Sequence, residues 1–372
     1  MKKILPLLFL LRLILLVYNM TMKHTFIDLF CGLGGFRIGF EKNGYKCVFS
    51  SDSDKYIQET YEENFGERPF GDITKVNPKD IPDFEVLTGG FPCQPFSISG
   101  KKLGFKDTRG TLFFDVCRII EEKNPKVVIL ENVKHFINHD KKRTMSVVLN
   151  SLEELGYNVS YEILNLKDFG LPQNRERIFI IGSKNNLFNF EKMNKQRSKP
   201  LKDFLDKSGD FEYLKKEEYT ILDEHLVVQQ ESGLIFVGFR NKKGFQSGLR
   251  TTKNQHLNRV HRQPNRIYSI NGYHPTIPSQ ESSGRFFIYL PRENRVRKLT
   301  INECFKIMGF DENYKKPSPT GQIYKQIGNS VGTNVIDELS NQIICQGLLD
   351  ESQRKTIRNT PKIVNRQTQL NI

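Results

Sequence analysis

Short apolar runs alternate with segments of helical periodicity through the first half of the chain, and this alternation constrains the fold more than any other feature of the sequence. Helices are predicted from a turn after the first run to about residue 43, at residues 112–122 and at residues 144–155. The runs predicted as buried strands are residues 25–30, 46–50, 84–87, 127–130, 159–166 and 177–181. Because parallel strands need crossover helices between them, the pattern predicts an α/β fold with a mostly parallel sheet.

A glycine-rich turn follows the first predicted strand. It reads Gly32-Leu33-Gly34-Gly35, and Asp52 stands at the end of the second strand, twenty residues past Gly32. In a doubly wound fold a carboxylate at that point binds ribose hydroxyls, so the two features together predict a nucleoside cofactor. The glycine spacing differs from the dinucleotide fingerprint and no Walker lysine follows, which disfavours a pyrophosphate ligand. The alternative is that these glycines only make a tight turn.

A cysteine flanked by glycines and prolines follows the third predicted strand. Residues 89–97 read Gly-Gly-Phe-Pro-Cys-Gln-Pro-Phe-Ser, which puts Cys93 at the edge of the sheet. The glycines and prolines let the backbone turn sharply and then hold it, so that amide donors can point at the sulfur and lower the pKa of the thiol. The stretch therefore predicts a nucleophile. The alternative is that Cys93 is a small buried apolar residue, as most free cysteines are.

Three further motifs accompany Cys93 in a fixed order. They are the segment 28–36 around the glycine turn, the tripeptide Glu131-Asn132-Val133, and the segment Gln173-Asn174-Arg175-Glu176-Arg177. In this order and at these spacings they resemble the motifs of the DNA (cytosine-5)-methyltransferases, over residues 25–182 and again over residues 297–335. The resemblance implies a Rossmann-like S-adenosylmethionine-dependent methyltransferase domain with a mostly parallel sheet, and a smaller loop-rich target-recognition domain.

The resemblance also implies the cofactor, S-adenosyl-L-methionine, and the residues that would bind it. Phe30 to Gly35 would line the methionine end, Asp52 the ribose and Asp72-Ile73 the adenine. The implied cofactor residues are Phe30, Gly32, Leu33, Gly34, Gly35, Asp52, Asp72, Ile73, Pro92, Asn329 and Ser330. One position departs from the family pattern, because members commonly carry an aromatic residue where Ser53 stands between Asp52 and Asp54. This departure puts aromatic stacking on the adenine in doubt.

Four residues are implied in catalysis. Carbon 5 of cytosine is a poor nucleophile, so the ring must first be activated by covalent attack at carbon 6, and Cys93 would make that attack as a thiolate. A protonated Glu131 would donate to N3 of the ring, and Arg177 would hold O2. Arg175 would steady the surroundings of the nucleophile. The reaction needs no metal, and the target cytosine must be flipped out of the duplex.

The charge of the chain favours a polyanionic partner. Fifty-six Lys and Arg residues against forty-two Asp and Glu give a formal charge of +14. Between residues 240 and 298 thirteen Lys or Arg residues stand against two acids, which suits loops that contact bases and phosphates of double-stranded DNA. The segment 258–269 resembles recognition domains that read guanine-guanine-(A/T)-cytosine-cytosine. The predicted DNA contacts are Ser97, Ser99, Lys101 and Arg109 in a polar loop after the nucleophile, and Arg259, Arg262 and Arg266.

The chain divides into five predicted segments. Residues 1–21 form an apolar leader that resembles a signal peptide but lacks a cleavage site; we interpret it as a mis-called start, with membrane tethering as the alternative. Residues 22–200 form the catalytic and cofactor domain, 201–296 the recognition domain, with a helical surface at 203–218, 297–350 the hinge and return, and 351–372 a basic tail. Six scattered cysteines show no metal or disulfide spacing, which predicts reduced thiols in a cytoplasmic protein.

The predicted role is that of a bacterial modification methylase. It would act as a monomer on duplex DNA and protect its host from a companion endonuclease that reads the same site without forming a stable complex. Two alternatives remain, a tRNA cytosine-5 methyltransferase of the same fold and a catalytically silent DNA-binding protein. The basic insert at 201–296 disfavours the first, and the intact set of Cys93, Glu131 and Arg177 disfavours the second.

Overall fold

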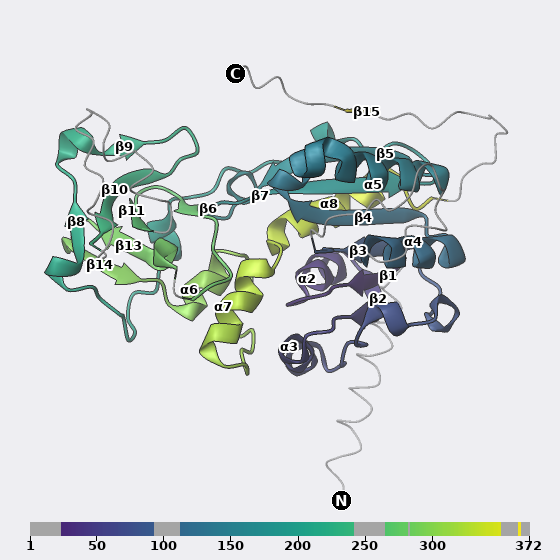
Figure 1. Cartoon of the computed structure of the whole chain (residues 1–372), viewed down its shortest axis with the longest axis horizontal. Helices are drawn as coiled ribbons and strands as arrows, with labels where there is room; N and C mark the ends of the chain where they lie inside the picture. Colours follow the sequence, from purple (N-terminus) through teal and green to yellow (C-terminus); the bar gives the residue numbers. More distant parts are fainter. Residues whose placement is uncertain (1–23, 93–111, 242–264, 282, 351–363, 366–372) are drawn as a thin grey trace, which may run out of the picture.

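The computed structural model describes residues 24–92, 112–241, 265–281, 283–350 and 364–365, arranged as a large lobe and a small lobe along the long axis of the molecule (Figure 1). The helices are α2 (Gly35–Lys42), α3 (Lys55–Phe65), α4 (Leu112–Lys123), α5 (Arg143–Glu154), α6 (Ile301–Lys306), α7 (Thr320–Asn329) and α8 (Thr333–Cys345). The strands of the large lobe are β1 (His24–Leu29), β2 (Tyr45–Ser51), β3 (Val86–Gly89), β4 (Val127–Val133), β5 (Asn158–Asn165), β7 (Glu176–Ser183) and β15 (Val364–Asn365). The predicted leader, residues 1–21, lies outside the described residues, as does most of the predicted tail.

The large sheet has the strand order β15-β5-β7-β4-β3-β1-β2. The prediction of a mostly parallel sheet is confirmed, with one exception: β7 is antiparallel to both of its neighbours, β4 and β5. The exception has a simple cause. The connection from β5 to β7 spans only residues 166–175, which is too short to hold a crossover helix, and a short connection can join only antiparallel neighbours.

Alternate residues of the central strands enter two separate apolar cores. In β4, Val127 and Ile129 pack into one core and Val128 and Leu130 into the other. Helices α2 and α8 supply residues to the first core, and α4 and α5 to the second, so that the sheet is covered on both faces. This double covering explains why the strands read as continuous apolar runs in the sequence, since neither face meets water.

The C-terminal helix α8 packs directly on the N-terminal helix α2. Gly39 of α2 permits this approach, because a Cβ atom there would lie 2.7 Å from the backbone nitrogen of Asp337. The contact is reinforced by Asn43, whose side-chain amide donates to Asp337 O at 2.9 Å and to Ser340 Oγ at 2.8 Å. An ion pair between Lys42 and Asp337 closes the edge of the interface. The two ends of the catalytic lobe are thereby joined in one layer.

The small lobe is built on a second sheet, and it is more regular than the sequence predicted. The strand order is β14-β13-β11-β10-β8, with β9 paired to β10. Its strands are β8 (Tyr219–Ile221), β9 (Val228–Gln229), β10 (Ile235–Arg240), β11 (Arg266–Ser269), β13 (Phe287–Leu290) and β14 (Arg295–Lys298). The predicted helical surface at 203–218 is wrong, because that segment holds only the end of one 3-10 turn, η6 (Leu201–Phe204), and a second short one, η7 (Lys216–Glu218). Its charged residues lack the apolar stripe that a surface helix needs.

Two links join the lobes. In the first, β6 (Gln173–Asn174) of the large lobe pairs with β12 (His274–Pro275) of the small lobe. In the second, Arg297 and Glu303 form a buried bidentate ion pair, with nitrogen–oxygen distances of 2.7 and 2.8 Å. Both Glu303 oxygens also accept backbone amides, from Asp206 at 2.9 Å and from Thr300 at 2.8 Å. Helix α6 therefore starts from a saturated junction at the base of the small lobe.

Candidate active site

The glycine turn after β1 is held by the carboxylate at the end of β2. Asp52 Oδ2 accepts the backbone amide of Gly32 at 3.1 Å, so the two residues that the sequence predicted to act together are in contact. Phe30, Gly32 and Gly34 all have positive φ, at 55°, 52° and 71°. A non-glycine residue seldom adopts this conformation, so the turn is tightly constrained where α2 begins. Burial raises the pKa of the Asp52 carboxyl.

The end of α7 returns to this turn. A Cβ atom on Gly35 would lie 2.6 Å from the Val331 side chain and 3.5 Å from Ser330 Oγ, which places the predicted cofactor residue Ser330 against the start of α2. Asn329, the last residue of α7, is exposed beside it. The segment that follows α7 thus meets the first βα unit, as the motif order predicted.

Arg175 is buried and binds backbone carbonyls on both sides of the site. Its buried guanidinium donates to the carbonyl oxygens of Gly328 at 2.8 Å, Ser330 at 2.7 Å and Ile277 at 3.3 Å. These three carbonyls belong to the end of α7 and to the small lobe. Arg175 therefore holds backbone segments together around the site, and among the described residues its hydrogen bonds go to backbone and not to a catalytic side chain.

Asp72 and Ile73, the residues predicted to bind the adenine, lie at the start of a 3-10 turn, η1 (Ile73–Lys75). Asp72 caps this turn by accepting the Thr74 amide at 3.0 Å and its hydroxyl at 2.8 Å, and these hydrogen bonds lower the pKa of the Asp72 carboxyl. Ile73 is buried in the core beneath. The turn thus fixes an exposed acid beside an apolar residue.

Cys93 lies outside the described residues, but the chain leading to it does not. Strand β3 ends at Gly89, and Phe91 is buried while Pro92 is exposed. The side-chain amide of Asn132 donates to Phe91 O at 2.9 Å and so attaches this segment to the end of β4. Asn132 belongs to a motif that the sequence identified, yet its tethering role was not predicted.

Glu131 and Arg177 form an ion pair on adjacent strands, β4 and β7, with Arg177 Nε 3.0 Å from Glu131 Oε1. Their side chains are 10% and 15% exposed, so the pair is buried but still reached by water. The second oxygen, Oε2, lies toward Gly90, where a Cβ atom would be 3.4 Å away. Burial raises the pKa of Glu131 despite the two arginines nearby. A carboxyl with a raised pKa keeps its proton to a higher pH than an exposed glutamate does.

A cavity of about 470 Å³ opens beside this pair, between the two lobes. Arg177 and Asn329 line it from the large lobe, and Thr276, Ile277 and Pro278 from the segment after β12. The sequence analysis did not single out residues 276–278. Gln173 positions them, because its Oε1 accepts the Ile277 amide at 2.9 Å, and Thr276 donates to Asn174 O at 2.9 Å. The Pro-Thr-Ile-Pro sequence marks a rigid turn, but nothing in its residue types indicates proximity to Arg177.

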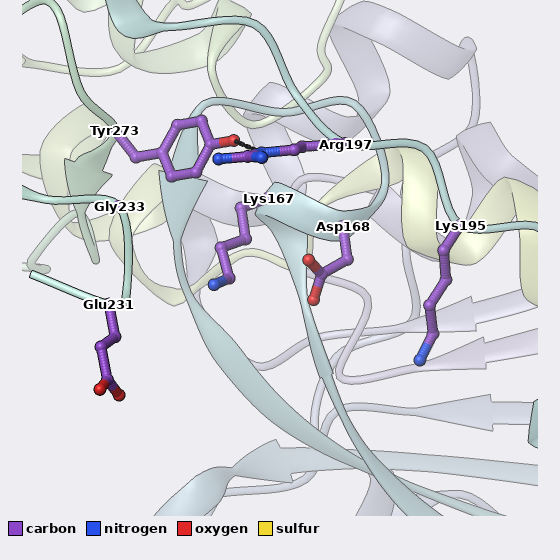
Figure 2. Close-up of a pocket in the computed structure, with 7 residues that line it drawn as sticks. All are labelled: Lys167, Asp168, Lys195, Arg197, Glu231, Gly233 and Tyr273. Carbon is purple, nitrogen blue, oxygen red and sulfur yellow. Dashed lines mark hydrogen bonds between the residues drawn. The ribbon is translucent and has the colours of Figure 1, made fainter.

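A second cavity, of about 400 Å³, lies on another side of the junction (Figure 2). Figure 2 shows Arg197 and Tyr273 pointing toward one another, with Arg197 Nε 3.2 Å from the Tyr273 hydroxyl oxygen. Lys167 and Lys195 also line it, but so do the acids Asp168 and Glu231. Because its charges are mixed and no predicted site residue reaches it, this cavity is not part of the candidate active site.

Most predicted DNA contacts cannot be placed. Ser97, Ser99, Lys101, Arg109, Arg259 and Arg262 lie outside the described residues. Arg266 is half-buried at the start of β11, with its guanidinium carbon 5.4 Å from the centre of the Phe236 ring.

The described residues contain no group of three or more His, Cys, Asp or Glu side chains arranged for a metal ion. Four of the described cysteines are buried and one, Cys345, is exposed, all as free thiols. In the same part of the chain no helix has the length and apolar character needed to cross a bilayer.

The chain matches known proteins over most of its length. The family model for C-5 cytosine-specific DNA methylases matches residues 24–345. The type II methyltransferase M.HhaI of Haemophilus parahaemolyticus is 42% identical over 330 residues, covering 86% of this chain and 93% of that protein. The type II methyltransferase M.SsoII of Shigella sonnei is 42% identical over 333 residues, covering 87% of this chain and 80% of that protein.

Solved structures agree in fold. The Dnmt2 methyltransferase of S. pombe superposes with a TM-score of 0.61 at 19% identity, covering 87% of this chain and 99% of that chain. A mutant DNMT2 of Spodoptera frugiperda gives the same TM-score at 18% identity, over 87% of this chain and 100% of that chain. At such low identity these likenesses establish the architecture alone. They confirm the prediction of an α/β methyltransferase domain with a smaller second domain.

Proposed function

The chain belongs to the C-5 cytosine-specific DNA methylase family, and from that membership we propose that it modifies host DNA in a bacterial restriction-modification system, with S-adenosyl-L-methionine as methyl donor. Its reaction is the transfer of a methyl group to carbon 5 of cytosine in DNA. The observation that carries the proposal is the Glu131–Arg177 pair, because it puts a proton-holding carboxyl and a cation beside a cavity between the lobes.

The residues around the glycine turn fit the proposed cofactor. Asp52 is a carboxylate at the end of a parallel strand, where it can accept ribose hydroxyls, and Ile73 offers apolar surface next to Asp72. Phe30, Leu33 and Pro92, with Asn329 and Ser330 at the end of α7, would complete the site. When bound, S-adenosylmethionine supplies an electrophilic methyl group on a sulfonium.

The proposed reaction divides the chemistry among three side chains. The Cys93 thiolate forms a bond to carbon 6 of the cytosine, and the electron density displaced toward N3 is met by the proton of Glu131. Arg177, held in place by Glu131, faces the cavity where O2 of the ring would lie. Carbon 5 then takes the methyl group. Loss of the carbon-5 proton to a base restores the double bond and expels the thiolate, and N3 returns its proton to Glu131.

The target cytosine must leave the duplex to reach this site, at a cost of a few kcal/mol. We propose that residues 22–200 form the catalytic domain, residues 201–296 the recognition domain and residues 297–350 the hinge, so that DNA lies between the lobes. The residues that would contact it are Ser97, Ser99, Lys101, Arg109, Arg259, Arg262 and Arg266. The enzyme would act in the cytoplasm as a monomer, and a companion endonuclease would read the same site independently.

A mechanism-based trap tests the proposal. Bisulfite sequencing of DNA from an expressing host first identifies the target site. Duplex DNA carrying 5-fluorocytosine at that site cannot lose its substituent, so with cofactor it should form a covalent adduct at Cys93 that survives denaturing electrophoresis. Cys93→Ser should form no adduct while still binding DNA, and Cys345→Ser is the matched control, because Cys345 is exposed on α8. Adduct formation by Cys93→Ser, or labelling of tRNA in preference to DNA, would overturn the proposal.

A further inference from the structure

Phe70 is the most exposed large apolar side chain among the described residues, at 59% of its surface. Single exposed apolar side chains are common on protein surfaces, so the exposure of Phe70 is informative only because of where the ring lies. Phe70 does not lie on a remote surface. It precedes Asp72 by two residues and is joined through its backbone to the end of β2.

The backbone of Phe70 is fixed between two residues of the cofactor strand. Its amide donates to Ser50 O at 2.8 Å, and its carbonyl accepts the Asp52 amide at 2.9 Å. Gln58 also holds this segment in place. Its side-chain amide donates to Asp52 O at 2.7 Å, and its side-chain oxygen accepts from Arg68 Nη2 at 3.2 Å. Phe70 therefore sits immediately beside the proposed ribose carboxylate, on backbone that does not have to rearrange.

One face of the Phe70 ring is already covered. It stacks on Phe49 with ring centres 4.7 Å apart and planes 21° from parallel. Phe49 itself is buried in the core. Since the inner face is packed and the side chain is still largely exposed, the outer face is the one presented to solvent. A flat ring supported from behind is a surface on which a second flat ring can stack.

We propose that Phe70 is the stacking platform for the adenine ring of the cofactor. Ser53, which is exposed beside Asp52, stands where family members commonly carry an aromatic residue, and its side chain cannot stack on a purine. Phe70 then covers one face of the purine, Asp72 lies near its polar edge, and Asp52 binds the ribose. The inference rests on the proposed function, since it takes S-adenosylmethionine as the ligand.

The experiment measures binding without turnover, by calorimetric titration with S-adenosylhomocysteine. Phe70→Ala should weaken binding by about tenfold, the size expected from losing one base–aromatic stack. Phe70→Tyr should bind within about twofold of the parent and Phe70→Leu should fall between, because leucine keeps apolar area but not the ring. Ile344→Ala is the matched control: Ile344 is also an exposed apolar residue, at 40%, but lies on α8.

A fluorescent variant separates stacking from mere proximity. The chain contains no tryptophan, so Phe70→Trp introduces a single indole. Adenosine and S-adenosylhomocysteine should quench it on stacking, whereas methionine should not. If the parent protein binds no S-adenosylhomocysteine, the proposed function fails. If the parent binds and Phe70→Ala binds equally well, with only its melting temperature reduced, the ring is a cap on Phe49 and this inference alone is overturned.

Discussion

Two buried arginine–glutamate pairs stand in different parts of this molecule and differ in how completely they are satisfied. At the hinge, Glu303 receives four donors: two from Arg297 and one each from the amides of Thr300 and Asp206. In the candidate active site, Glu131 has one ion-pair partner among the described residues, Arg177, whose Nε lies 3.0 Å from Oε1. The hinge side chains are 1% and 0% exposed, against 15% and 10% in the active site.

The difference separates architecture from chemistry. A carboxylate whose oxygens are all occupied by fixed donors has no capacity left for a substrate, and removing it leaves a sealed arginine without a partner. Among the described residues Glu131 has Arg177 as its ion-pair partner, and its second oxygen lies toward Gly90, so it has fewer fixed donors than Glu303. A buried acid with few fixed donors is the better candidate for proton exchange with a substrate, and we expect Glu131 to be that acid.

The largest expected effect is on the active-site pair. Glu131→Gln keeps the shape but removes the proton, so methyl transfer should fall about a thousandfold, within the range for loss of a general acid. The glutamine oxygen can still accept from Arg177, so the free energy of unfolding should fall by less than it does in the corresponding Glu303 variant. Tritium transfer from labelled cofactor to duplex DNA measures the first, and urea unfolding the second. Near-normal activity with lost stability would place Glu131 with the hinge pair.

The hinge pair should show the reverse. Glu303→Gln puts a donor where four donors already point, and it should lower the free energy of unfolding by about 3 kcal/mol, the usual cost of breaking a sealed ion pair. Activity per folded molecule at low temperature should stay within a few-fold of the parent. Urea denaturation with parallel methylation assays distinguishes the two effects, and unchanged stability would contradict the comparison.

The pH dependence sharpens the comparison further. The folded-state pKa of Glu131 is raised, so its proton is bound below that pKa and lost above it. We expect kcat/KM to fall by about tenfold per pH unit once the pH exceeds that pKa. Folding stability has the same sign: the contribution is present at low pH and is lost as the pH rises through the folded pKa. The fall in kcat/KM at high pH should be absent from the pH profile of Glu131→Gln.

The smallest predicted effect concerns the start of α6. Thr300 Oγ1 accepts the Glu303 amide at 3.0 Å, and its own amide donates to the Glu303 carboxylate, which makes a capping box. Thr300→Ala should lower the free energy of unfolding by about 1 kcal/mol without altering methylation. Thr300→Ser restores the hydroxyl and should recover most of that loss. A larger fall in activity than in stability would give the hinge a direct part in catalysis.

Sequence reasoning succeeded where local pattern and motif coincide. Strands such as residues 127–130 are apolar on both faces, and the Gly32–Asp52 pairing follows from the βαβ unit. Glu131 lies within β4, two residues before its end, as the predicted strand at 127–130 implied; its catalytic role stays a prediction. The antiparallel β7 was not predicted, since only the length of the connection determines it.

Other features depend on contacts between distant segments. Nothing local to Thr276 indicates that it lies beside Arg177, because Gln173, more than a hundred residues earlier, sets that position. Arg175 was predicted to steady the surroundings of the nucleophile, which stays a prediction; that its hydrogen bonds go to carbonyls of residues 277, 328 and 330 could not be read from the sequence. The sequence shows that such a residue is charged, but only the folded structure shows which carbonyl groups it donates hydrogen bonds to.

The packing of α8 on α2 has a consequence for how the enzyme is made. Lys42 of α2 pairs with Asp337 of α8, which is synthesised 295 residues later. Until then α2, with Phe36 and Phe40, lacks the helix that packs on it in the folded protein. At typical elongation rates the delay is roughly 15 to 60 s. A nascent or truncated chain that ends before Thr333 also lacks this covering layer. The cell therefore meets an aggregation-prone intermediate first and a working methylase only when synthesis is almost complete.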